Sequence, residues 1–158
     1  MQSRFRIAYT IDSIDPDALR FDSSELSFQL HAITGRATVS MSDKRVDVST
    51  CSLLHFAQTL AYLSTMPLLY GTEEWEGNID HGLDMSSSME SDLLRLTFSG
   101  LPIPPTVNFY IPPLMALSEV GRVNGELVKA YYKAVGDRRK YLRISQLLPF
   151  ASVKLIPQ

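Results

Sequence analysis

Several features are scarce in this chain, and each scarcity excludes a class of protein. There is one cysteine, Cys51, so no intrachain disulfide can form, and this usage suits a reducing cytoplasm. No run of 18 apolar residues occurs, so we expect no membrane span. The first residues alternate apolar with polar instead of forming the continuous apolar stretch of a signal peptide. The sequence therefore predicts a cytoplasmic protein.

Motifs that carry catalytic chemistry are also lacking. The chain has no Gly-rich phosphate loop, no G-x-S-x-G and no C-x-x-C, so no cofactor is predicted. Cys51 and His55 are four residues apart, which would place both on one face of a helix and Cys51 in its first turn. A cysteine opening an apolar helix is more often a small buried side chain than a nucleophile. The pattern favours a protein that is not an enzyme, with a small Cys/His or metal-dependent enzyme as the alternative.

Basic residues are absent between Thr72 and Asp92, where seven acidic residues occur: Glu73, Glu74, Glu76, Asp80, Asp84, Glu90 and Asp92. The segment from Val120 onward instead holds eight basic residues and two acidic ones. His81 lies among the carboxylates, but its spacing matches no defined metal motif, so a solvated acidic loop is favoured over a metal site. Arg138-Arg139-Lys140 lacks interleaved aromatics and the pI is 5.9, so no nucleic-acid partner is predicted.

The pattern that is present is that of a single α+β domain, residues 1–158. Period-two alternation predicts a hairpin of Glu25–Ile33 and Arg36–Ser42, with Thr34-Gly35 as its turn. Ser49 or Thr50 can then cap an apolar helix that starts near Leu53 and ends at Met66-Pro67.

The remaining elements follow from the same rules. Three more strands are predicted, one at about Arg4–Ile11, one through Leu94–Phe98 and one through Val107–Ile111, the last near a sheet edge because prolines flank it. The stretch Gly71–Ser91 has little periodicity and reads as a long loop. A second helix ends at Val135; its start is left open between Pro113 and Asn124, and Val153–Ile156 is a possible closing strand. Together they predict a mainly antiparallel sheet of five or six strands on two main helices.

The alternating strands Glu25–Ile33 and Arg36–Ser42, the Ser52–Ala57 helix start and the acidic segment resemble small immunity proteins of bacterial toxin–immunity pairs. The resemblance covers about Glu25–Leu69 and the general layout. It implies an α+β fold without catalytic residues, and a cognate protein toxin as the partner, neutralised by covering its active site. It assigns no binding residue.

The binding residues are predicted on physical grounds instead. Like charges crowded on a short segment repel one another, and a basic partner surface would relieve that repulsion. Trp75 would supply the buried anchor. The expected contact set is Glu73, Glu74, Trp75, Glu76, Asp80 and Asp84. Two alternatives stay open: the segment folds back on Lys129, Lys133 and Arg138–Lys140, or the chain is a regulatory subunit or self-dimer.

Overall fold

The computed structural model describes residues 3–15, 32–71, 73–79, 82–100 and 105–136. Within these ranges lie seven strands and two long helices. In chain order they are β1 (Arg6–Ile14), β2 (Ile33–Met41), β3 (Lys44–Ser52), α2 (Leu53–Tyr70), β4 (Trp75–Ile79), β5 (Leu83–Glu90), β6 (Leu93–Gly100), β7 (Val107–Ile111) and α3 (Pro113–Val135). The α+β class predicted from the sequence is confirmed.

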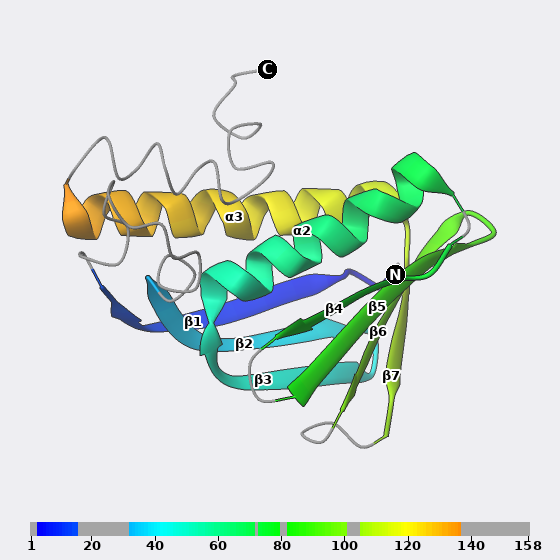
Figure 1. Ribbon diagram of the computed structural model, residues 1–158, viewed down its shortest axis with the longest axis horizontal. Coiled ribbons are helices and arrows are strands. Elements are labelled where there is room, and N and C mark those ends of the chain that lie inside the picture. Colours follow the sequence, from blue (N-terminus) through cyan, green and yellow to red (C-terminus); the bar gives the residue numbers. More distant parts are fainter. Residues whose placement is uncertain (1–2, 16–31, 72, 80–81, 101–104, 137–158) are drawn as a thin grey trace.

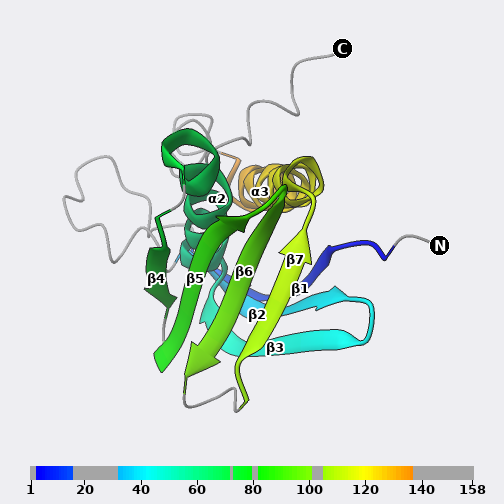
Figure 2. The same cartoon turned by 90° about the vertical axis from the view of Figure 1, so that its right-hand side faces the viewer.

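The strands form two antiparallel sheets. The first sheet has the order β1-β2-β3, and the second has the order β4-β5-β6-β7. The two helices lie side by side over one face of the first sheet, and the second sheet stands across one end of it (Figures 1 and 2). The expectation of one sheet with five or six strands was wrong, because α2 separates two independent meanders.

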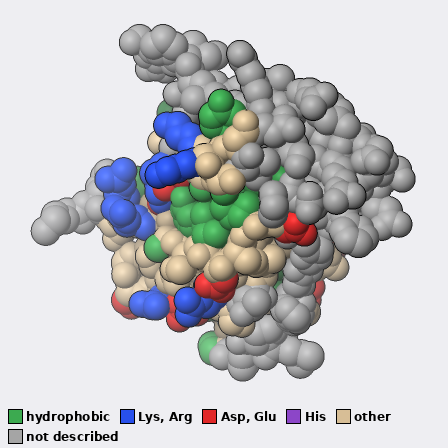
Figure 3. Space-filling model, turned by 90° about the vertical axis from the view of Figure 1, so that its left-hand side faces the viewer, with side chains coloured by type: hydrophobic (Ala, Val, Ile, Leu, Met, Phe, Trp, Pro, Cys, Tyr) green, Lys and Arg blue, Asp and Glu red, His purple; other side chains and the backbone are tan. Residues whose placement is uncertain are grey.

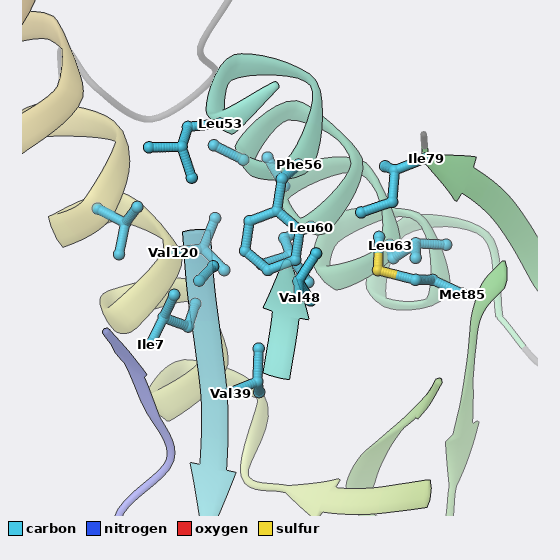
Figure 4. Packing of buried hydrophobic residues seen from close by; sticks show 14 of the residues in the cluster. Ile7, Val39, Val48, Leu53, Phe56, Leu60, Leu63, Ile79, Met85 and Val120 are labelled. Carbon is cyan, nitrogen blue, oxygen red and sulfur yellow. The ribbon is translucent and has the colours of Figure 1, made fainter. Parts of the chain in front are cut away.

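Helix α2 joins the two sheets through a single core. It packs against β2 and β3 of the first sheet, against β4, β5 and β6 of the second, and against α3. Figure 4 shows Phe56, Leu60 and Leu63 of α2 between Val48 of the first sheet and Met85 of the second. Ser52 caps the helix by accepting a hydrogen bond from the His55 backbone N–H, at 3.2 Å, so the cap lies later than Ser49 or Thr50.

The free edge of β1 is covered by side chains of α3. A Glu119 carboxylate oxygen accepts from the Ile7 N–H at 2.7 Å, and Arg122 donates to the Ile7 carbonyl at 2.6 Å. Arg122 also bonds Glu119 and Glu126, and the Tyr9 hydroxyl donates to Glu126 at 2.9 Å. Two side chains thus take the place of a neighbouring strand at Ile7, which protects an otherwise open edge.

The predicted turn at Thr34-Gly35 is wrong, because both residues lie inside β2. Both sides of β2 are occupied, by β1 and by β3, and the hairpin turn falls at Ser42-Asp43 between β2 and β3. The glycine has a different role. A Cβ at Gly35 would lie 2.0 Å from the Thr10 carbonyl oxygen, next to irregularities in both strand pairings, so close backbone approach requires glycine. Most of Glu25–Ile33 lies outside the described residues.

One further boundary needs correction, and the start of the second helix, which the sequence left open, is defined. Helix α2 continues through Pro67 to Tyr70, and Gly71 then donates to the Pro67 carbonyl. The preference of pre-proline residues for extended backbone is overcome by the burial of Pro67 and Leu63. Helix α3 runs unbroken from Pro113 past Asn124 and ends at Val135, as predicted, with Gly136 in the left-handed conformation.

The predicted strands of the C-terminal half have mixed outcomes. Leu94–Phe98 and Val107–Ile111 are confirmed as β6 and β7, and β7 is an edge strand. Residues 153–156 lie outside the described part of the chain. No helix in the described ranges is both long and apolar enough to span a membrane.

Candidate interaction surface

The acidic segment forms strands rather than the predicted loop. β4 and β5 both fall within Gly71–Ser91, paired from Trp75 with Ser87 to Ile79 with Leu83. Burial alternates along β4, so Trp75, Gly77 and Ile79 face α2 while Glu76 and Asn78 face outward. The prediction of a loop failed because Gly77 interrupts the apolar face of β4 and serines occupy much of β5.

Two rows of polar residues cross the outer face of the second sheet. One row pairs Glu76, Ser86, Thr97 and Asn108, and the next pairs Asn78, Asp84 and Ser99. An open depression of about 500 Å³ lies over these rows; it is lined by Glu74, Glu76, Gly77, Asn78, Asp84, Met85, Ser86 and Ser99. We call this the acidic face. Three of the predicted carboxylates, Glu74, Glu76 and Asp84, therefore lie together.

The charge of the acidic face is partly neutralised. Arg95 of β6 lies 3.6 Å from Glu74 and 3.0 Å from Glu90. Glu76 and Asp84 make no ion pair within the described part of the chain. Arg95 was not predicted as part of this surface, although its outward position in the alternation of β6 could have indicated it.

No described contact supports the alternative that the acidic segment folds back on basic side chains of α3. Lys129 and Lys133 are exposed, and no ion pair joins them to it among the described residues. The side of the molecule away from the second sheet, where α3 ends, shows Lys and Arg side chains beside a hydrophobic area (Figure 3). Arg138–Lys140, Asp80 and His81 lie outside the described residues.

Trp75 does not stand among the glutamates as an outward anchor. Its ring is half-buried and packs against two tyrosines of α2, with centroids 6.0 Å from Tyr62 and 5.9 Å from Tyr70. Its indole N–H is buried with no hydrogen-bond acceptor in the described part of the chain, and the ring is packed against the two tyrosines. Trp75 and the acidic face therefore lie on opposite sides of β4.

Comparisons with known proteins add no assignment. No family model, curated protein or solved structure matches this chain. The site is therefore interpreted from its own residues.

The Cys51–His55 pair is placed differently from the prediction. Cys51 is buried in β3, opposite Gly35, and not in the first turn of α2. The His55 backbone N–H donates to the Ser52 hydroxyl at the helix cap, and the His55 residue is partly exposed. Cys51 and His55 therefore lie in different elements, β3 and α2, and do not share the helical face that the spacing predicted. In the described ranges no three His, Cys, Asp or Glu residues cluster as metal ligands would.

Proposed function

We propose that this protein binds and occludes a basic protein partner with its acidic face, and that the partner is a toxin which the protein neutralises. The observation that carries the proposal is the open depression on the second sheet, beside which Glu76 and Asp84 have no ion-pair partner among the described residues. Such an arrangement complements Lys or Arg side chains, and toxins that act on nucleic acids or phosphorylated cofactors need basic clefts.

The rigidity of the surface supports this role. Glu76 and Asp84 project from paired strands whose inner face packs on α2, so little conformational entropy is lost when a partner docks. The carboxylates also attract a basic partner over a distance of about 8–10 Å at ordinary salt, which raises the association rate.

The test is a kinetic comparison of three variants with the protein encoded by the adjacent reading frame. Glu76→Gln and Asp84→Asn should each slow association by a few-fold and flatten its salt dependence. Asp43→Asn removes the same charge from the β2–β3 turn of the first sheet and should change neither. If all three variants associate like the parent chain, the acidic face is not the interface.

A further inference from the structure

An exposed apolar patch lies on α2 beside β4. Tyr62, Met66, Leu69 and Tyr70 follow the spacing of one helical face, opposite the buried face of α2. Tyr62 is 41% exposed, and Leu69 and Tyr70 are each 65% exposed. Trp75 packs against both tyrosines. We call these five residues the aromatic patch. Contiguous exposed apolar side chains of this kind are typical of interaction sites.

The strand next to the patch has an edge that no described strand pairs. Among the described residues, β4 is the terminal strand of the second sheet and pairs only with β5. Within the described residues, no strand or side chain bonds its other side. The edge of β1 is instead covered by Glu119 and Arg122, and β7 is flanked by Pro105, Pro112 and Pro113. β4 carries neither Pro nor Lys, so its backbone can accept another strand.

The charge around β4 selects the kind of strand that fits. Glu73 and Glu74 precede β4, and Glu76 projects from its outer face. A second copy of this chain pairing through β4 would bring these carboxylates together, which is destabilising. A strand with alternating side chains could instead place basic residues beside Glu76 and apolar residues on the aromatic patch.

We propose that β4 is a strand-addition site, which takes an extended partner segment with alternating basic and apolar side chains. The proposal rests on the proposed function, because it names the binding mode of a basic partner next to the acidic face. Backbone hydrogen bonds to β4 provide affinity, and the aromatic patch selects the apolar side chains. Trp75, the one tryptophan of the chain, reports on occupation of the patch.

The experiment titrates the full chain with the heptapeptide Lys-Leu-Lys-Phe-Lys-Leu-Lys while following Trp75 emission and amide exchange of β4. We expect a change of Trp75 emission and slower exchange over Trp75–Ile79. A peptide N-methylated at alternate residues keeps the side chains but cannot extend the sheet, and should bind at least about tenfold more weakly. A scrambled peptide of the same composition should also bind more weakly than the alternating peptide, by a similar factor.

Two chain variants locate the site. Tyr62→Ser should weaken binding of the heptapeptide at least about tenfold, because truncating a buried aromatic anchor typically has an effect of this size. Tyr110→Ser is the matched control: Tyr110 is also 41% exposed but lies on β7, at the far edge of the same sheet. Its effect should be within about twofold.

Three results would overturn strand addition. The first is equal binding of the methylated and alternating peptides, which would mean simple charge attraction and leave the proposed function standing. The second is no binding of the heptapeptide at all. The third is concentration-dependent self-association of the free chain that Tyr62→Ser abolishes, which would make a second copy the occupant. Failure of the proposed function appears separately, in unchanged association of Glu76→Gln and Asp84→Asn with the adjacent gene product.

Discussion

Glu119 is a buried charged residue held in place by hydrogen bonds. Its side chain is almost fully buried, and burial alone would raise its pKa. Hydrogen bonds from Arg122 and from the Ile7 N–H, with the charges of Arg122 and Arg6, outweigh burial and lower the pKa below its ordinary value. The neighbouring Tyr9 hydroxyl has a raised pKa, first through burial and then through its hydrogen bond to Glu126. Folding thus favours the ionised form of the Glu119 carboxylate.

Glu119→Gln should destabilise the protein by about 1.5–3 kcal/mol at neutral pH, because the carboxylate accepts three charge-assisted hydrogen bonds, two from Arg122 and one from the Ile7 N–H, that a neutral amide cannot all keep. The contribution of Glu119 is present above its unfolded pKa and is lost as pH falls through the lower folded pKa. Urea unfolding from pH 7 down to about pH 3 should therefore show the two proteins converging in acid. Glu126 is a more exposed carboxylate of the same network, so Glu126→Gln should lower the free energy of unfolding by less than about 1 kcal/mol. Parallel stability curves for Glu119→Gln and the parent would contradict this role.

Gly35→Ala should lower the free energy of unfolding by about 3 kcal/mol or more, because a Cβ there would collide with the backbone carbonyl of Thr10. Gly77→Ala provides the comparison. Its Cβ would meet the Thr59 methyl at 2.7 Å, and a side chain yields more easily than backbone. We expect a cost of about 1 kcal/mol for Gly77→Ala. Thermal unfolding of the two variants measures the difference, and equal costs would argue against the close approach of β1 and β2.

At the scale of elements, β4 depends on α2. Trp75→Ala should destabilise the protein by about 2 kcal/mol, less than a fully buried tryptophan, because the side chain is only partly buried. Amide exchange should quicken over β4 before it does over β6, since β6 pairs with two described strands and β4 with one. Trp75→Phe keeps much of the ring packing and should restore most of the protection. Unchanged exchange in Trp75→Ala would show that the β4–β5 pairing alone holds the strand.

The elements also show how far the sequence could be interpreted. β6, β7 and the end of α3 followed from alternation, flanking prolines and Gly136, all of which are local signals. The pairing of β2 could not be predicted in this way. By local rules Gly35 indicates a turn, whereas in the structure a glycine is needed there because the Thr10 carbonyl, distant in sequence, approaches too closely for a Cβ. β5 could have been found, since Leu83, Met85 and Met89 keep period two. Glu74, Glu76 and Asp84 were predicted as contacts, but their separation from Trp75 required the pairing of β4 with β5.

At the scale of the molecule, α2 makes the two sheets one cooperative unit. Leu60 of α2 is buried in the core that both sheets share. Leu60→Ala should lower the free energy of unfolding by about 2–5 kcal/mol. Trp75 emission reports on the second sheet, whereas far-ultraviolet circular dichroism reports on the whole chain. Both should shift to the same new midpoint in urea. Separate midpoints would mean that the sheets unfold independently.

The side-chain cover on the edge of β1 has a consequence for synthesis. Glu119 follows Ile7 by 112 residues. At ribosomal rates of about 5–20 residues per second, α3 emerges on the order of 10 s after β1. During that interval β2 and β3 can already pair with β1, but the other edge of β1 stays open to a neighbouring nascent chain. Slow translation of the C-terminal half, or loss of α3, would therefore lengthen the time in which two newly made chains can aggregate through β1.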